Sequence, residues 1–457
     1  MINENMCFDI IDYGINHGAK FVEIFAEHAW NSRIALVNRD IKNMDSSEIS
    51  GTGIRIMMKD KISYVYINSY KKDKLIELMK NIIMENQLGY KRVLPQKSNN
   101  AVSEFSRHDN LKKQIKLGLL WNIYGEVSSR SSLIKTLGVE IDDKVQEILV
   151  CNSEGIYKKD YRNYSRCTAK VVVSNQGKIQ TGIQTICHRK GFEYWKDICF
   201  NEWGKQFVDK TINMLYAEEC PAGKFPVIIN SGFGGVLFHE ACGHSLESSN
   251  IINNATGYME KLGKKIAAES VTLVDDGSIA GAWGSNSIDD EGTETRRNIL
   301  IEHGELKGIM VDYNGAELLK LKKTGNGRRQ NYTYMPVARM TNTFIEAASG
   351  NEKDLFKGVD KGLYVANVGG GSVNTVTGEY NFSVTEGYWI ENGKIAYPVK
   401  GASLIGKGNE TLLNIEKISN DLRIEHGMCI AKSGKIPVGI GQPQIKIAEM
   451  IIGGKHV

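Results

Sequence analysis

The chain has 457 residues, of which 41% are hydrophobic and 24% charged, and its formal net charge is +4 at pH 7. This composition is typical of a globular protein with a large core, and the length predicts two or three domains. The charges nearly balance and form no long run of one sign, which argues against a nucleic-acid partner.

The first residues and the cysteines indicate the compartment. The start, MINENMCFDIIDYG, lacks the basic residue of a signal peptide, and no stretch of the chain approaches the roughly 18 consecutive apolar residues of a membrane span. The eight cysteines are scattered, with no CxxC pair, as expected for reduced thiols. We therefore expect a cytoplasmic protein.

Residues 1–92 predict a small α/β domain. Apolar residues recur at helical spacing from Asn3 to His17, and Gly18 is placed to cap that helix. A second helix is expected at residues 73–88. Three segments rich in β-branched and aromatic residues predict strands between these helices: FVEIFAEH (21–28), TGIRIMM (52–58) and ISYVYIN (62–68). The polar stretch 91–110 has no sustained period and predicts a linker.

Residues 110–217 predict a middle domain made of an antiparallel sheet with helices. A helix is expected at 110–128, and the segments 144–161 and 167–188 then alternate as strands joined by turns that contain Asn and Gly. The stretch AEECPAGKFP (217–226) has two prolines and a glycine and marks a second boundary. The fold class predicted for the whole chain is α+β.

The third domain, residues 222–457, is expected to be rich in β-structure, with hairpins such as IENGKIAYPV. It opens with a strand, FPVIIN, a glycine turn, SGFGG, and a helix that starts at Val236. That order also suits a phosphate cradle, but neither the Lys-Ser/Thr ending of a P-loop nor GxGxxG is present, so a tight turn is the preferred interpretation.

The helix after this turn carries the sequence FHEACGHSLE, in which His239 and His244 lie five positions apart and Glu240 follows the first. On a regular helix five residues span a rotation of about 140°, so the two imidazoles would point to different sides. We expect the backbone to depart from α geometry near Gly243, which would let them converge on a metal. The alternative is two unrelated histidines on a buried helix. A catalytic zinc site needs three protein ligands, so a third Cys, His, Asp or Glu should lie elsewhere in the chain.

At this point the sequence resembles the TldD/PmbA (TldD/TldE) metallopeptidases, most densely from about residue 225 onward. The blocks that carry the resemblance are LFHEACGHSLE, VDDGSIAGAWGSNSIDDEGTETRRNILIEHGELKGIM, TGNGRRQNYTYMPVARMTNTF, GGGSVNTVTGEYNFSVTEGYWIENGKIAYPVKGASLIGKG and GMCIAKSGKIPVGIGQPQIKI. The resemblance implies that His239, His244 and Cys429 bind zinc and that Glu240 is the catalytic carboxylate.

The resemblance also implies an activity and a partner. The family pairs a subunit that carries HExxxH with a paralogue that lacks it, so the intact motif here resembles the catalytic, TldD-type subunit of a heterodimer with a TldE/PmbA-like partner, with a homodimer as the other option. The implied substrates are unfolded or extended polypeptides, such as leader or modified peptides in natural-product maturation or labile small proteins.

Several residues near these motifs keep two interpretations. Cys242 is either a packing residue, which we prefer, or a competing ligand, and Glu247 is either a support for a ligand imidazole or a surface carboxylate. The acidic cluster is expected in structural turns rather than in a calcium site: Asp275, Asp276, Asp289, Asp290 and Glu291. Four residues are candidate donors to a peptide carbonyl or oxyanion: Arg328, Arg329, Tyr332 and Tyr334.

Two rival functions remain at the level of sequence. One is a non-catalytic peptide-binding or scaffold subunit of the same assembly. The other is a thiol hydrolase that uses Cys429 or Cys242 as its nucleophile with a histidine as base. The thiol enzyme should survive metal removal, whereas the metallopeptidase should not.

Overall fold

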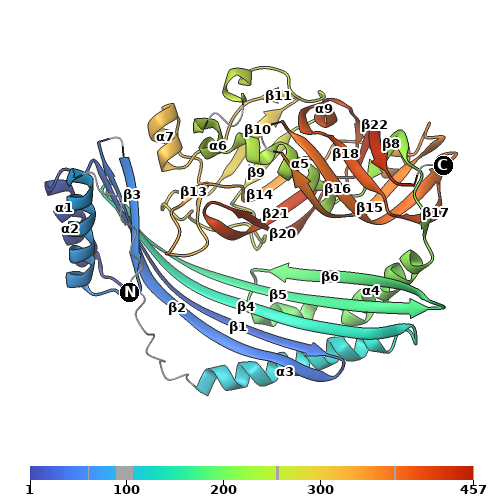
Figure 1. Ribbon diagram of the computed structural model, residues 1–457, viewed down its shortest axis with the longest axis horizontal. Helices are drawn as coiled ribbons and strands as arrows, with labels where there is room; N and C mark the ends of the chain where they lie inside the picture. The colour runs from blue at the N-terminus through green and yellow to red at the C-terminus, as the bar shows by residue number, and fades with distance from the viewer. Residues whose placement is uncertain (60, 89–106, 254–256, 375–376, 456–457) are drawn as a thin grey trace.

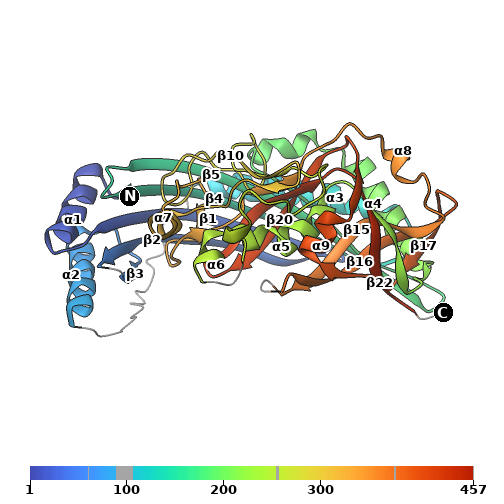
Figure 2. The same ribbon diagram turned by 90° about the horizontal axis from the view of Figure 1, so that it is seen from above.

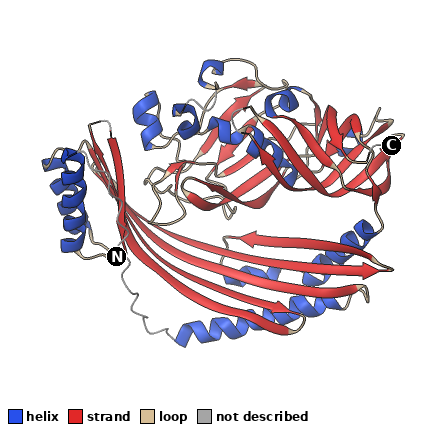
Figure 3. Cartoon of the chain, in the orientation of Figure 1, coloured by secondary structure: helices blue, strands red, loops and turns tan. Residues whose placement is uncertain are grey.

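The computed structural model describes residues 1–457 except 60, 89–106, 254–256, 375–376 and 456–457. Strands dominate it, and helices lie around the sheets, which confirms the α+β prediction (Figure 3). Among the described residues, no helix is both long and apolar enough to cross a membrane.

The first half of the chain forms one continuous antiparallel sheet with the strand order β3-β2-β1-β4-β5-β6. Its strands are β1 (Phe21–Val37), β2 (Asp40–Met58), β3 (Lys61–Ile67), β4 (Ile134–Asn152), β5 (Tyr157–Asn175) and β6 (Lys178–His188). The strands predicted for the first two domains therefore share a sheet, because β1 pairs with β4 along fifteen register positions from Glu23↔Asn152 to Val37↔Gly138.

Helices cover one face of this sheet (Figure 1). They are α1 (Glu4–Asn16), α2 (Lys72–Leu88), α3 (Arg107–Ser128) and α4 (Phe200–Leu215). α1 and α2 enclose one apolar cluster with β1 and β2, and α3 and α4 enclose a second with β4 and β5. The predicted helices are confirmed, and Gly18 follows the C-cap of α1 with φ +95°. Of the predicted linker, residues 91–106 lie outside the described residues, and 107–110 belong to α3.

The C-terminal half lies over the other, concave face of this sheet (Figure 1) and contains two further large sheets. One has the order β15-β8-β22-β18-β16-β17-β7, with β19 paired to β22, and the other has the order β11-β10-β9-β14-β21-β20. The strands of the first are β7 (Glu218–Glu219), β8 (Gly223–Ile229), β15 (Lys361–Val373), β16 (Glu379–Glu391), β17 (Lys394–Lys400), β18 (Ser403–Lys407), β19 (Ile415–Ile418) and β22 (Ile445–Gly453). Those of the second are β9 (Leu273–Asp276), β10 (Arg297–Glu302), β11 (Glu305–Leu306), β14 (Asn342–Ile345), β20 (Arg423–Ala431) and β21 (Gly434–Gln442).

Short elements complete this half of the molecule. β12 (Gly327–Arg328) and β13 (Val337–Ala338) form a two-stranded ribbon, and the helices are α5 (Val236–Ala241), α6 (Ser248–Ile252), α7 (Tyr313–Leu319), α8 (Glu352–Leu355) and α9 (Gly408–Leu413). The hairpin predicted at IENGKIAYPV joins β16 to β17 through Asn392 and Gly393, both with positive φ, as a tight hairpin turn requires. Seen from above, α1 and α2 lie at the opposite end of the molecule from the C-terminus (Figure 2).

A buried ion network joins the two halves. Arg55 of β2 lies 2.5 Å from Glu23 of β1 and 2.7 Å from Glu291 of the C-terminal half, and Arg329 lies 2.6 Å from Glu23. All four side chains are at most 2% exposed. A buried charge is tolerated only when it is paired, so these contacts hold the sheet against the C-terminal half.

Replacing Arg55 by Met should therefore lower the free energy of unfolding by about 3–5 kcal/mol, because Glu23 and Glu291 would lose their shared cation in a buried site. The measurement is urea denaturation followed by circular dichroism. Arg33→Met is the matched control, since the Arg33 side chain is 52% exposed beside Glu140 and should change stability by no more than about 0.5 kcal/mol. Equal losses in the two variants would contradict the role given to the network.

Candidate metal centre

The two histidines converge because the helix that carries them ends between them. α5 stops at Ala241, Cys242 adopts φ −127° and ψ −49°, and Gly243–Leu246 form a 3₁₀ turn. The rings of His239 and His244 consequently lie 5.2 Å apart, centroid to centroid, at 84°. The expected departure from α geometry is confirmed, although the distorted residue is Cys242 rather than Gly243.

Gly243 is needed for close packing rather than for an unusual backbone conformation, since its φ is not positive. A Cβ added at this position would come within 2.3 Å of the sulfur of Met340. The side chain of Met340 is completely buried, so the turn that carries His244 lies directly against the core.

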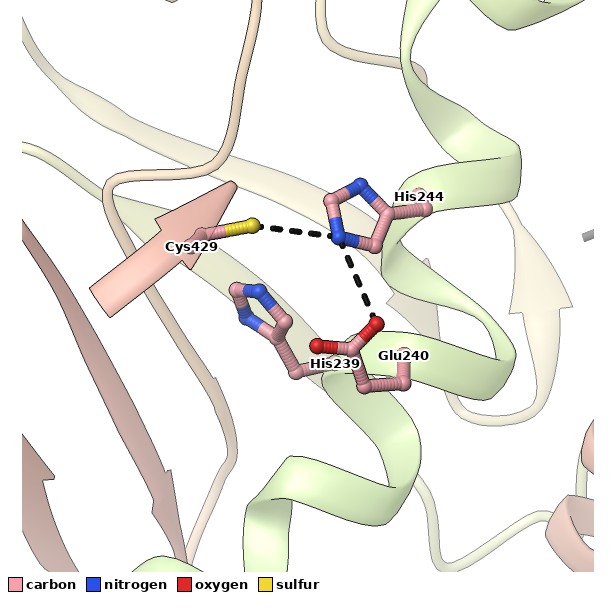
Figure 4. A group of neighbouring side chains, drawn as sticks. All are labelled: His239, Glu240, His244 and Cys429. Carbon is pink, nitrogen blue, oxygen red and sulfur yellow. Dashed lines mark hydrogen bonds and ion pairs between the residues drawn. The ribbon is translucent and has the colours of Figure 1, made fainter. Parts of the chain in front are cut away.

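Four side chains meet at one point (Figure 4): His239, Glu240, His244 and Cys429 each offer a ligand atom, and these atoms all lie within 4.8 Å of one another. The Sγ of Cys429 is 3.2 Å from Nε2 of His244, and Oε2 of Glu240 is 3.6 Å from the same nitrogen. Cys429 comes from β20, 185 residues away in sequence from His244. In the described part of the chain this is the only group of its kind.

The donor set fits a zinc ion. Both ring nitrogens of His239 are buried and have no hydrogen-bond partner, an arrangement that costs about 1–3 kcal/mol for each unsatisfied polar group. A metal bound through one of these nitrogens would satisfy it. Two imidazoles and a thiolate are ligands that zinc accepts, and three protein ligands are the number found in catalytic zinc sites.

Glu247 supports one of the two imidazoles and is not a surface carboxylate. Its Oε1 lies 3.1 Å from Nδ1 of His244, and the Glu247 side chain is 3% exposed. Asn250 donates its side-chain N–H to the backbone oxygen of His244 at 2.7 Å and to Glu247 at 3.3 Å. With Nδ1 held by a carboxylate, Nε2 is the nitrogen left to face Cys429.

Electrostatics differ between the residues of the group. Burial, with smaller contributions from nearby cations, keeps the pKa of His239 well below its usual value, so its imidazole is neutral, as a metal ligand must be. Burial opposes charge on His244 as well, but Glu247 and Cys429 outweigh it and raise the pKa of His244, so a metal bound to this imidazole would have to displace its proton. Burial also raises the pKa of Glu240, against the opposing effect of His244. Glu240 is the most exposed of the four, with 30% of its side chain accessible.

Cys242 packs in the core, as preferred from the sequence. It is fully buried within the main apolar cluster of the C-terminal half and does not belong to the metal-ligating group. Burial raises the pKa of its thiol to about 12. Such a thiol carries almost no thiolate near neutral pH, which argues against Cys242 as a nucleophile.

The acidic cluster is structural. Asp275 accepts hydrogen bonds from the backbone and side chain of Thr341, and Asp289 accepts the backbone N–H groups of residues 291, 293 and 327. Asp276 accepts the backbone N–H and hydroxyl of Ser278, Asp290 pairs with Arg162 at 2.6 Å, and Glu291 pairs with Arg55. These carboxylates hold loops and join the two halves.

Two of the four predicted oxyanion donors, Arg328 and Arg329, are bonded elsewhere. Arg328 donates to the backbone oxygens of Met340 and Pro437, and Arg329 donates to Glu23 and to the backbone oxygen of Asp290. Tyr332 is buried against the first sheet, and Tyr334 lies in the following turn. The structure does not bring any of the four into the metal-ligating group.

No local sequence pattern indicates the space between the two halves of the molecule. Two cavities of about 510 and 760 Å³ lie between the first sheet and the C-terminal half, and Arg166, Trp283 and Met428 line both of them. Met428 precedes Cys429 on β20, so the strand that supplies Cys429 forms part of both cavity walls. Only the pairing of distant strands reveals this arrangement.

Known proteins resemble this chain along its whole length. Family models match three segments: PmbA/TldA metallopeptidase domain 1 at residues 22–83, the central domain at 108–215 and the C-terminal domain at 222–454. A Metalloprotease TldD homolog from Buchnera aphidicola (Acyrthosiphon pisum) is 34% identical over 464 aligned residues, covering 99% of this chain and 94% of the relative. The chain belongs to the PmbA/TldD family of metallopeptidases.

A more distant relative and a solved structure are also similar to this chain. A Zinc metalloprotease TldD homolog from Saccharolobus solfataricus is 26% identical over 448 residues, covering 96% of this chain and 97% of the relative. The crystal structure of TldE from Thermococcus kodakarensis has the same fold, with a TM-score of 0.76 at 18% identity over 98% of this chain and 100% of that one.

The packing of Gly243 against Met340 can be tested by a double-mutant cycle. Gly243→Ala should destabilise the protein by about 1–3 kcal/mol through overpacking, and Met340→Ala should destabilise it by about 2–5 kcal/mol through a cavity. The double variant should lose less than the sum of the two, because the cavity accepts the new methyl group. Urea denaturation measures all three, and strictly additive losses would show that the two residues do not compete for space.

Proposed function

We propose that this chain is the catalytic, zinc-dependent subunit of a TldD/TldE-type peptidase that cleaves unfolded or extended polypeptides in the cytoplasm. The observation that carries the proposal is the convergence of His239, Glu240, His244 and Cys429 within 4.8 Å, from two elements far apart in sequence. His239, His244 and Cys429 are the ligands in this proposal. The relative named as a zinc metalloprotease supports the choice of metal.

The chemistry divides between the metal and Glu240. When bound, zinc supplies a Lewis acid toward the scissile carbonyl and lowers the pKa of an attacking water. Glu240 accepts the proton of that water and returns it to the leaving amine. Two features support this role: Glu240 lies beside His244, and it is the most accessible residue of the group.

The edge of β20 supports an extended substrate. In the described part of the chain β20 is the last strand of its sheet. The backbone N–H of Gly439 on β21 donates to the backbone oxygen of Thr341, on the side of β21 that faces away from β20. Gly439 and its register partner on β20, His426, therefore form a pair without hydrogen bonds between them. By alternation, the backbone groups of His426, Met428 and Ile430 point to the open edge, where a peptide can pair as an added strand.

The cavities support the same substrate class. A strand added to β20 would run beside Met428, which lines both cavities, while the side chain of the next residue, Cys429, points to the other face of the strand, toward the metal-ligating group. Main-chain pairing gives affinity with little dependence on side chains, so we expect weak sequence preference. Leader or modified peptides and labile small proteins meet this description, whereas a folded protein keeps most of its strands paired within its own sheets.

The TldE fold supports a paralogous partner. In the proposed heterodimer this chain supplies the metal centre and the partner encloses the substrate, while a homodimer is the alternative assembly. A non-catalytic, peptide-binding role for this chain is the competing function.

Metal analysis of purified variants tests the centre. The wild type should hold about one zinc per chain, His239→Ala and Cys429→Ala should lose it, and Glu240→Gln should keep it while peptidase activity falls about 10²–10⁴-fold. Mass spectrometry measures the metal, and cleavage of an unfolded peptide, with and without a TldE-type partner, measures activity. Cys220→Ala, which removes a buried thiol of the same core, is the control.

Each outcome separates two functions. Zinc retained by Cys429→Ala would exclude this ligand set. A wild type that holds zinc but is inactive even with the partner would indicate the non-catalytic subunit. Activity that survives chelation and is lost on alkylation would indicate a thiol hydrolase instead.

Proline at the open edge tests the path of the substrate. Ile430 is 73% exposed, and its N–H points away from β21, so Ile430→Pro removes a donor to the peptide without removing a ladder bond. We expect kcat/KM to fall about tenfold or more, which corresponds to the loss of about 1.4 kcal/mol. Ile430→Ala, which keeps the N–H, should change it less, and both variants should keep their zinc. Equal kinetics for the two variants would rule out pairing at this position.

A further inference from the structure

Arg339 is a buried arginine that the chemistry described so far does not use. It follows β13, its backbone N–H bonds to the oxygen of Asn326 at 2.9 Å, and its side chain is 1% exposed. Its Nε and Nη2 have no hydrogen-bond partner although they are buried. A buried guanidinium that leaves two nitrogens unsatisfied is costly, so its hydrogen bonds alone do not explain its place.

The first contact of Arg339 is with the support of His244. Nε of Arg339 lies 3.9 Å from Oε1 of Glu247, an ion-pair distance, and the same oxygen lies 3.1 Å from Nδ1 of His244. The Glu247 carboxylate is buried, so it requires a cation nearby. Arg339 supplies that charge at ion-pair distance and makes no hydrogen bond that would compete with His244 for the same oxygen.

The second contact is with the hairpin that carries Cys429. Nη1 of Arg339 donates to the hydroxyl of Ser433 at 3.1 Å and to the backbone oxygen of Gly434 at 3.3 Å. Ser433 lies in the turn between β20 and β21, four residues beyond Cys429. One guanidinium thus touches both elements that meet at the metal centre.

We propose that Arg339 is a positioning residue that fixes Cys429 relative to His244, so that the two ligands from separate elements are held at metal-binding distance. This inference rests on the proposed zinc centre. A planar guanidinium can reach the carboxylate and the turn at once, whereas the single ammonium of lysine can keep the charge but not both contacts. Arg339 does not touch the substrate in this assignment.

Cobalt is the probe that separates positioning from general stability. Metal-free wild type, Arg339→Met and Arg339→Lys are titrated with Co²⁺, and the thiolate-to-cobalt absorption per bound ion reports whether Cys429 is a ligand. Zinc affinity follows by competition. Arg328→Met and Arg328→Lys are the controls, because Arg328 is similarly buried and also reaches this hairpin, through the backbone oxygen of Pro437 on β21, but has no contact with Glu247.

Arg339→Met should weaken zinc binding about 10–100-fold and reduce the thiolate band of the saturated protein, as loss of a ligand's support does in other metal sites. The zinc affinity and thiolate band of Arg339→Lys should be intermediate between those of Arg339→Met and wild type, and both Arg328 variants should keep the wild-type spectrum. If Arg339→Met does not fold, as judged by circular dichroism, Arg339→Lys and Ser433→Ala carry the test, because each removes part of the link with a small change in volume.

The outcomes distinguish this inference from the zinc proposal itself. A wild type that binds neither metal would overturn the proposed centre. A wild type that binds both, with Arg339 and Arg328 variants that match each other in affinity and spectrum, would overturn only the role of Arg339 and leave it a structural residue.

Discussion

The site depends on the end of one helix. Two imidazoles five residues apart diverge by about 140° on a continuous α-helix, and no side-chain rotation brings both to one ion from there. Ending α5 at Ala241 turns the chain at Cys242 and brings His244 back toward His239. The turn is short and buried, so its shape must come from what lies against it: Met340 beside Gly243, and Glu247 and Asn250 around His244.

Local sequence patterns predict the individual helices and strands of this fold better than they predict how distant segments pair. Segments such as FVEIFAEH and TGIRIMM carry enough β-branched and aromatic residues to be assigned as strands, and α1 carries a helical period and a glycine cap. In the structure the first of these strands continues to Val37 and the second begins at Asp40. Both are longer than predicted, because backbone pairing continues through polar residues that have no apolar pattern. The pairing of β1 with β4, which makes one sheet of two predicted domains, joins residues more than a hundred positions apart and has no local sign.

The site shows the same division. HExxxH indicates a candidate metal site by its residue types, and its spacing predicts the break in the helix. Cys429 has no feature of its own to separate it from the other buried thiols, and only its resemblance to a family block singled it out. Glu247 could be proposed from its spacing to His244, while Arg339 was missed because an arginine in VARM gives no local sign of a contact. Arg339 is recognised only from its contact with the buried carboxylate of Glu247, and that contact is visible only in the three-dimensional structure.

The acidic residues for which the sequence leaves a calcium site as an alternative join the two halves of the molecule instead. Asp290 and Glu291 pair with Arg162 and Arg55 of the first sheet, and Arg329 reaches Glu23 on the same sheet. Each pair crosses from the C-terminal half to the strands that wall the cavities, and Arg162, Asp290 and Arg329 line the smaller cavity themselves. Buried pairs contribute little net stability but are costly to break, so they fix a geometry more than they add to stability. Because these pairs join the first sheet to the half of the molecule that contains β20, they hold the two walls of the cavities in a fixed relation to the strand that carries Cys429.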